Sequence, residues 1–378
     1  MDGVFESIPE IIDSASKSLL ATFSLLVILL TLLAFLFFRK SSARIKVSIF
    51  LLLLLGVVVF SVTLFSGDFN GENHLSKIDD TLIIGGKDFP ESNIILEIMA
   101  QTIHSKIPNL KIERIYSITV SRNIFDKMLR GEVHLYGEYT GTILAKHFNR
   151  PFREYSNLKS HSKNFINKLF QKDKDKRHLK WLGRFGFDNK YMLTMLRVKA
   201  EAIGIIGKDG RTNISRLSGV SDKLTFRSTP DFFDRPDGLK GLVTEYKLNF
   251  KDDQIILHED KYSSLKNNEM DVTDGYETDP EIYSEDNLFI KIEDDQGFFP
   301  SYYLGPLIDQ GFLEKFGTLE IVLAMLSNKI SEKEMAGLIG QYQKEGLYGK
   351  NLNTSGIAQS KLQKIVHKFL VKKKVLAD

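Results

Sequence analysis

The stretch TLIIGGKDFPESNIILEIMAQTI, residues 81–103, decides the fold of this chain. Its first residues form a short apolar run typical of a β-strand, and a double glycine stops that run. Asp88 followed three places later by Glu91 predicts a capping box, and apolar residues recur at helical spacing from Ile94 onward. Lys87 is therefore expected at a strand-to-helix turn, where free backbone N–H groups favour an anion such as a carboxylate.

The same alternation of strand and helix continues beyond this stretch. Residues 111–116 predict a second strand, Ser121 begins the next helix, and Gly131 ends that helix as a left-handed residue. Residues 133–136 predict a third strand, with GEYTGT (137–142) at its carboxyl end. This alternation is typical of α/β proteins with mostly parallel sheets, which bind ligands at the carboxyl ends of their strands.

Two long apolar runs precede the folded part. Residues 19–38 and 47–66 contain no charged side chain, and each is long enough to cross a hydrocarbon layer of about 30 Å. The loop between them, residues 39–46, is basic and contains no acid, which places it in the cytoplasm. We therefore expect a transmembrane hairpin, with residues 1–18 outside and residues 67–80 as an extracytoplasmic tether. The alternative is that the second run is a signal segment that is later cut.

Composition excludes several classes of function. A net charge of +3, from 51 basic and 48 acidic residues, provides no field of one sign for nucleic acid. The absence of cysteine removes disulfides, thiolate nucleophiles and cysteine metal sites. The sequence also lacks a Walker-type GxxxxGK[ST] segment, a GxSxG elbow and histidines at metal-ligand spacing. We therefore expect no enzyme, no cofactor or metal, and no protein that powers transport by itself.

Six short segments along the chain are rich in aromatic and charged residues. They are GGKDFPE (85–91), GEYTGT (137–142), FDNKY (187–191), FFDRPDGL (232–239), DGYETDP (274–280) and FPSYY (299–303). A quaternary ammonium group has charge but no N–H to donate, so a protein grips it with aromatic faces or anions. A carboxylate requires Lys, Arg or hydroxyl donors. The segments together predict a site for a ligand that joins a quaternary ammonium to a carboxylate.

In this order and with these gaps, the segments resemble the substrate-binding domains of bacterial ABC importers for glycine betaine, choline, carnitine and related osmoprotectants. The strongest matches are IIGGKDFPESNIILEIMAQ, GEVHLYGEYTGT, FFDRPDGLKGL, MDVTDGYETD and IEDDQGFFPSYYLGP. The resemblance implies an α/β, two-lobed periplasmic-binding-protein fold of the type II-like kind, whose lobes close over a ligand by hinge motion. Lobe 1 would contain residues 81–186 and 294–378, and lobe 2 residues 187–293.

The resemblance also implies an ammonium box of four tyrosines and three carboxylate anchors. The box falls on Tyr139, Tyr191, Tyr276 and Tyr302, and the anchors fall on Lys87, Thr142 and Arg235. Two alternatives stay open at this point. Tyr303 is an adjacent rival for Tyr302, and Arg235 instead forms an ion pair with Asp231 or Asp234.

Two departures from the family pattern bear on the ligand. His134-Leu135-Tyr136-Gly137-Glu138 stands where relatives usually have Asp-Leu-Tyr-Pro-Glu, and Lys190 stands beside a box tyrosine where a small polar residue is usual. Choline lacks a carboxylate and would leave the anchors unpaired, so we expect betaine-type ligands over choline. The implied partners are ABC permease and ATPase subunits on other chains, with the binding domain on the extracytoplasmic or periplasmic side of the bacterial cell (inner) membrane. The alternative is an extracytoplasmic solute sensor with the same binding fold.

Overall fold

The computed structural model describes residues 81–118, 121–256 and 260–377. The predicted transmembrane runs, their loop, the preceding N-terminal segment and the tether all lie outside the described residues. Within the part that is described, no helix is long and apolar enough to cross a membrane. The described residues belong to one unit, Ile78–Asp378.

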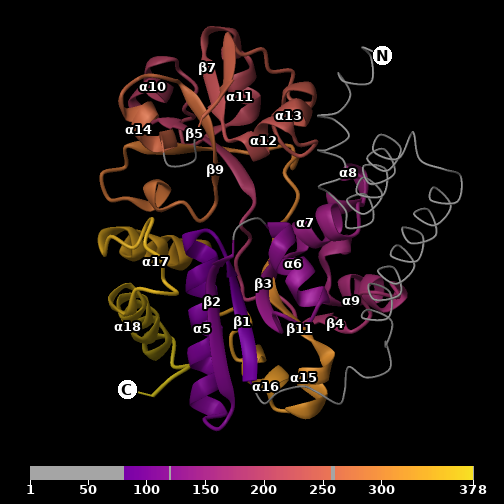
Figure 1. The fold of residues 1–378 in the computed structure, drawn as a ribbon. Coiled ribbons are helices and arrows are strands. Elements are labelled where there is room, and N and C mark those ends of the chain that lie inside the picture. Colours follow the sequence, from indigo (N-terminus) through magenta and orange to yellow (C-terminus); the bar gives the residue numbers. More distant parts are fainter. Residues whose placement is uncertain (1–80, 119–120, 257–259, 378) are drawn as a thin grey trace, which may run out of the picture. The chain divides into compact units, whose positions relative to one another are not determined.

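A five-stranded sheet, in the order β2-β1-β3-β11-β4, forms the centre of the first lobe (Figure 1). Its strands are β1 (Thr81–Lys87), β2 (Lys111–Ile118), β3 (Leu135–Tyr139), β4 (Leu179–Trp181) and β11 (Leu304–Asp309). Strand β1 runs parallel to β2 and β3, whereas β11 runs antiparallel to β3 and β4. The sheet is mixed because β11 enters it in the opposite direction, after the chain has passed through the second sheet.

A six-stranded sheet, in the order β6-β10-β5-β9-β7-β8, forms the centre of the second lobe. Its strands are β5 (Tyr191–Leu196), β6 (Thr212–Asn213), β7 (Thr225–Ser228), β8 (Asp252–Ile255), β9 (Val272–Tyr276) and β10 (Phe289–Glu293). Strand β7 runs parallel to β8 and β9, but β5 runs antiparallel to both of its neighbours, β9 and β10. The α/β prediction is confirmed, whereas the expectation of mostly parallel sheets is wrong at β5 and β11. We call the parts built around the two sheets lobe 1 and lobe 2.

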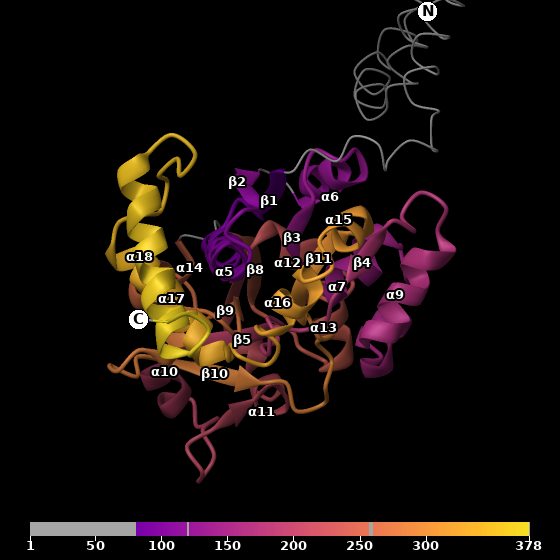
Figure 2. The same cartoon turned by 90° about the horizontal axis from the view of Figure 1, so that it is seen from below.

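The helices of lobe 1 come from both sides of lobe 2 in the sequence. They are α5 (Pro90–Lys106), α6 (Ser121–Leu129), α7 (Thr140–Thr142), α8 (Phe152–Tyr155), α9 (Lys163–Lys172), α15 (Gln310–Lys315), α16 (Leu319–Ala324), α17 (Glu332–Lys344) and α18 (Gly356–Lys372). Helix α5, predicted from its apolar spacing, buries Ile94, Ile98 and Met99 completely. Helices α16, α17 and α18 pack against α5, and Figures 1 and 2 show α17 and α18 side by side next to it.

Lobe 2 has a hydrophobic core of its own, which includes Tyr191, Leu193 and Phe226. Its helices are α10 (Arg197–Ala202), α11 (Ile214–Ser218), α12 (Pro230–Asp234), α13 (Leu239–Glu245) and α14 (Lys261–Lys266). Because each lobe buries its own apolar side chains, polar groups can occupy the region where the lobes meet.

Helix α5 begins differently from the sequence prediction. Phe89 is its N-cap and makes no side-chain capping bond, and Pro90 opens the first turn, where a missing N–H costs nothing. The hydroxyl of Ser92 accepts a hydrogen bond of 2.8 Å from the backbone N–H of Lys87, and Glu91 is buried. The predicted capping box of Asp88 and Glu91 is therefore wrong.

Candidate functional site

Strand register places two of the predicted tyrosines side by side. Strand β5 begins at Tyr191 and β9 ends at Tyr276, and the antiparallel pairing aligns these two residues directly. Their ring centroids lie 5.1 Å apart. A residue at the start of one strand and a residue at the end of another thus form one surface.

The same relation brings the segment before β11 to the end of β3. Leu304, the first residue of β11, pairs with Tyr139, the last residue of β3. The preceding Tyr302 lies on Gly141 of α7, where an added Cβ would be only 2.5 Å from Cε1 of the tyrosine ring. Glycine at this position of GEYTGT therefore allows the ring to lie directly on the backbone.

Three of the four predicted box tyrosines form a cluster, which we call the tyrosine cluster: Tyr191, Tyr276 and Tyr302. The ring centroid of Tyr302 lies 6.1 Å from that of Tyr191 in an edge-on arrangement. The guanidinium carbon of Arg235 lies 5.8 Å from the ring centroids of both Tyr191 and Tyr302. The cluster therefore already contacts one delocalised cation, supplied by the protein.

The charge of Arg235 is balanced within the protein. Its Nε and one terminal nitrogen donate to the two oxygens of Asp237 at 2.8 and 2.7 Å, and it also donates to the hydroxyl of Tyr302. Burial alone raises the pKa of Asp237, but the hydrogen bonds and charge of Arg235 outweigh burial and lower it below its usual range. The alternative partner Asp234 pairs instead with Lys240, and the side chain of Asp231 lies outside the described set.

Tyr303, the rival of Tyr302, has different neighbours. The guanidinium carbon of Arg184 lies 4.9 Å from its ring centroid, and the ring of His161 packs edge-on at 6.1 Å. Of these two adjacent tyrosines, Tyr302 therefore belongs to the tyrosine cluster, whereas the ring of Tyr303 packs against Arg184 and His161.

A tyrosine that sequence reasoning missed also approaches this site. Tyr155 of α8 is buried, and the charge of Asp237 adds to burial in raising its pKa. The neighbouring Phe152 packs against Phe298, which follows β10 and belongs to the hydrophobic core of lobe 2, with centroids 5.3 Å apart. Helix α8 therefore reaches across to the second lobe. Tyr155 follows no glycine-rich turn and stands at no strand end, so its sequence context carried no signal.

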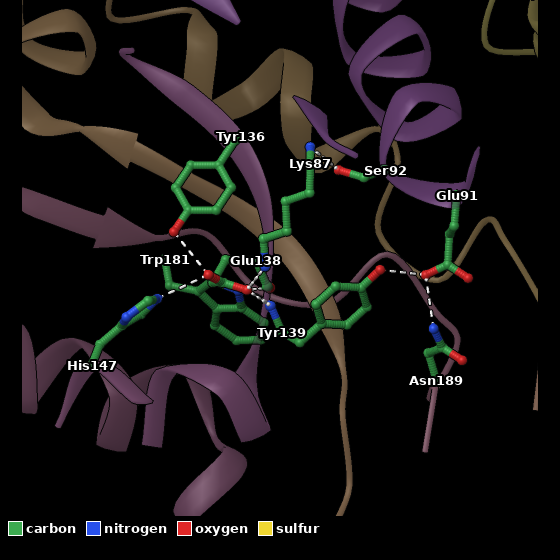
Figure 3. A network of polar contacts seen from close by, with 9 residues as sticks. All are labelled: Lys87, Glu91, Ser92, Tyr136, Glu138, Tyr139, His147, Trp181 and Asn189. Carbon is green, nitrogen blue, oxygen red and sulfur yellow. Dashed lines mark hydrogen bonds and ion pairs between the residues drawn. The ribbon is translucent and has the colours of Figure 1, made fainter. Parts of the chain in front are cut away.

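Lys87 does not stand free at the strand end. Its Nζ lies 2.6 Å from Oε1 of Glu138, and these two side chains are only 3% and 0% exposed. Glu138 also accepts hydrogen bonds from the hydroxyl of Tyr136 and from the imidazole of His147 (Figure 3). Burial raises the pKa of Glu138, but the charge of Lys87 and the bond from His147 outweigh it and lower the pKa to about 2. Lys87 and Glu138 thus form a charged, buried pair.

Tyr139 belongs to a second group of contacts next to this pair. Its ring lies 5.2 Å from Nζ of Lys87, and its hydroxyl donates to Oε1 of Glu91 at 2.5 Å (Figure 3). Glu91 in turn contacts Asn189, which precedes β5, and Thr278, which follows β9. Thr142 is partly buried at the end of α7. The structure therefore divides the predicted residues between the tyrosine cluster with Arg235 and a neighbouring polar network around Lys87 and Tyr139.

A two-lobed α/β fold with clustered aromatic rings and buried charges is the architecture of solute-binding proteins whose lobes close over a ligand. Residues 80–350 match the family described as the substrate-binding domain of ABC-type glycine betaine transport systems. The chain belongs to this family, whose members are solute-binding proteins of ABC transporters and not enzymes.

Individual relatives agree with this assignment. The carnitine transport binding protein OpuCC of Listeria monocytogenes is 30% identical over 289 residues, which cover 75% of this chain and 87% of the relative. The ergothioneine transport permease/ergothioneine binding protein EgtU of Helicobacter pylori is 29% identical over 271 residues, 70% of this chain. This chain spans only 45% of that protein's length.

Solved structures show the same fold. A crystal structure described as a glycine betaine/carnitine/choline ABC transporter matches with a TM-score of 0.65 at 21% identity, covering 78% of this chain and 99% of that one. Apo YehZ from Escherichia coli matches with a TM-score of 0.59 at 17% identity, covering 79% and 100%. The predicted two-lobed binding-protein fold is confirmed.

Proposed function

We propose that this chain binds a betaine-type solute, a quaternary ammonium joined to a carboxylate, and delivers it to an ABC importer. The observation that carries the proposal is the guanidinium of Arg235, 5.8 Å from the ring centroids of Tyr191 and Tyr302. Rings that accept a delocalised cation suit a trimethylammonium group, because it offers charge without N–H donors. Tyr276 and Tyr139 complete the proposed ammonium box.

The proposed carboxylate anchors keep donors for a ligand although each cation already has an acid partner. Arginine has five N–H groups, and Asp237 and Tyr302 use three contacts from Arg235. Lysine has three N–H groups, and Glu138 takes one from Lys87. Thr142, the last residue of α7, is the third proposed anchor and would offer a hydroxyl. Because both cations are neutralised internally, each contributes less to carboxylate binding than a free cation would.

The transport role requires partners. The sequence has no Walker-type segment, so we propose that permease and ATPase subunits reside on other chains. The two apolar runs, 19–38 and 47–66, are proposed to anchor the binding domain on the outer side of the cell membrane. The names of two relatives, a carnitine transport binding protein and a combined permease and binding protein, support a role in solute uptake.

Calorimetric titration of the full-length chain with glycine betaine, carnitine, choline and ergothioneine tests the proposal. Loss of one ring from a cation site costs roughly 0.5–2 kcal/mol, so Tyr191→Ala is expected to weaken glycine betaine binding by about 2-fold to 30-fold. Tyr303→Ala is the matched control and is expected to bind as the wild type does, because its ring faces Arg184. Equal losses in both variants would contradict the tyrosine-cluster assignment. Tight binding of choline alone would refute the betaine-type ligand, because choline lacks a carboxylate. Ergothioneine is also a trimethylammonium joined to a carboxylate, so its binding alone would keep the ligand class and reject glycine betaine as the solute.

A further inference from the structure

Glu91 joins the two lobes through a closed ring of three side chains. Its Oε2 lies 2.7 Å from Oγ1 of Thr278, and its Oε1 lies 3.2 Å from Nδ2 of Asn189. Oγ1 of Thr278 lies 2.9 Å from Oδ1 of Asn189, which completes the ring. Glu91 belongs to α5 of lobe 1 and Thr278 follows β9 of lobe 2, so the ring spans both lobes (Figure 3 shows Glu91 and Asn189).

Counting hydrogen atoms decides the charge of this ring. Three contacts need three hydrogens, and the hydroxyl of Thr278 supplies one. The amide of Asn189 directs its nitrogen to one neighbour and its oxygen to the other, so it supplies one, whichever way the amide is turned. The third hydrogen can come only from the carboxyl group of Glu91. An ionised Glu91 would leave two oxygen atoms facing each other without a proton between them.

We propose that Glu91 is a protonated positioning residue, which holds lobe 1 to lobe 2 and fixes the orientation of Tyr139 in the ligand site. Tyr139 donates to Oε1 at 2.5 Å, the oxygen that stays a carbonyl acceptor when Oε2 carries the proton. The chain with joined lobes therefore binds a proton at Glu91 in addition to the solute.

The surroundings of Glu91 favour the neutral form. Burial is the largest influence and raises its pKa to about 7, the charge of Asp279 acts in the same direction, and the bonds from Tyr139, Thr278 and Asn189 oppose it. The neighbouring cation from β1, Lys87, is held by Glu138 at 2.6 Å and is committed to that acid. Within the described residues, the groups that hydrogen-bond to Glu91 are the hydroxyl of Tyr139, the amide of Asn189 and the hydroxyl of Thr278, and none of these carries a positive charge.

The proton makes ligand binding depend on pH, an inference that rests on the proposed function. When the lobes separate, water reaches Glu91 and its pKa returns towards the ordinary 4.5. Joining the lobes around a ligand near neutral pH then takes up a proton. The affinity for glycine betaine is expected to fall about tenfold between pH 6 and pH 8. Joining the lobes requires a proton on Glu91, and protonating Glu91 costs more free energy as pH rises past its pKa of about 7.

Glu91→Gln provides the test, because a glutamine amide supplies the missing N–H at every pH. Calorimetry with glycine betaine is expected to show the tenfold fall for the full-length wild type and a constant affinity for Glu91→Gln. Glu113→Gln, at an exposed position of β2, is the control and is expected to follow the wild type. A Glu91→Gln variant with the same pH dependence as the wild type would overturn the proposal.

A second readout follows Glu91 itself and separates this inference from the proposed function. When a solute holds the lobes together, the unfolding midpoint of the wild type relative to Glu91→Gln is expected to fall as pH rises from 5 to 8, since a carboxyl pKa raised to about 7 stabilises the fold at low pH and that stabilisation is lost as pH rises through 7. A ¹³C carboxyl signal that is absent in Glu91→Gln should titrate near pH 7 whenever the lobes are joined. Titration near 4.5 in the free chain and also with each of the four solutes present would refute the proton, whether or not glycine betaine binds. Absence of glycine betaine binding together with titration near 7 would reject that ligand and support the protonated ring.

Discussion

Replacing Gly141 by alanine tests whether the ring of Tyr302 is held directly against the backbone of α7. The added Cβ would lie 2.5 Å from Cε1 and 2.7 Å from Cδ1 and Cζ of the ring. Unbonded carbons prefer separations of about 3.5–4.0 Å, so the ring must move by about 1 Å. It cannot move freely, because its hydroxyl donates to Asp237 at 2.5 Å and accepts from Arg235. Overpacking of this kind costs about 1–3 kcal/mol.

The free energy of unfolding of the Gly141→Ala chain, measured in urea, is therefore expected to fall by about 1–3 kcal/mol. The same chain is expected to bind glycine betaine at least about fivefold more weakly. Gly337→Ala is the matched control, because Gly337 is an exposed glycine of α17 whose added Cβ meets nothing within 4 Å. It should gain about 0.5–1 kcal/mol, since alanine favours helix over glycine. Tyr302→Ala should remove most of the cost of Gly141→Ala in the double variant. Wild-type unfolding and binding by Gly141→Ala would refute the packing argument.

Three further predictions concern the buried charges. Glu138→Gln leaves Lys87 buried without an anion, so the free energy of unfolding in urea should fall by about 3–5 kcal/mol, and an unchanged value would show that the pair is dispensable. The lowered pKa of Glu138, about 2, means that its stabilisation is present above the ordinary 4.5 and is lost as pH falls towards 2. Unfolding midpoints between pH 5 and 2 should therefore fall more steeply for the wild type than for Glu138→Gln; parallel curves would contradict this. Arg235→Met leaves Asp237 as an unpaired anion near the tyrosine cluster, so choline should gain on glycine betaine by about tenfold or more in the ratio of Kd values, and an unchanged ratio would remove Arg235 from carboxylate binding.

Local patterns predicted the elements well. The apolar run and the apolar spacing after it correctly gave strand β1 and helix α5, and Gly131 adopts the expected left-handed conformation with φ of 71°. The double glycine does not stop the strand as predicted, because β1 continues through it to Lys87. The capping box failed because Pro90 already opens the helix, which leaves Glu91 free to turn inward towards the second lobe. A residue type at a fixed spacing cannot reveal whether its side chain closes a helix or crosses to another lobe.

The sequence predicted the candidate site as a set of residues, but it could not predict their arrangement. Tyr191, Tyr276 and Tyr302 meet because antiparallel strands align the start of one with the end of another, a relation that depends on strand order across the whole chain. The structure pairs Arg235 with Asp237, two places on, where the sequence offered other acids, and Tyr155 joined the site without any motif.

The sequence by itself determined the α/β character of this chain and its membership of a solute-binding family. It also determined the aromatic and cationic residues of the candidate site, because all of these follow from local spacing and motif order. Tertiary structure alone decided which charges neutralise each other and which carboxyl group keeps its proton. Those outcomes depend on distances of a few ångströms between residues far apart in the chain. Burial makes these distances matter more, because an ionised group removed from water is stable only next to an opposite charge or hydrogen-bond donors. A buried carboxyl group without such neighbours stays protonated instead.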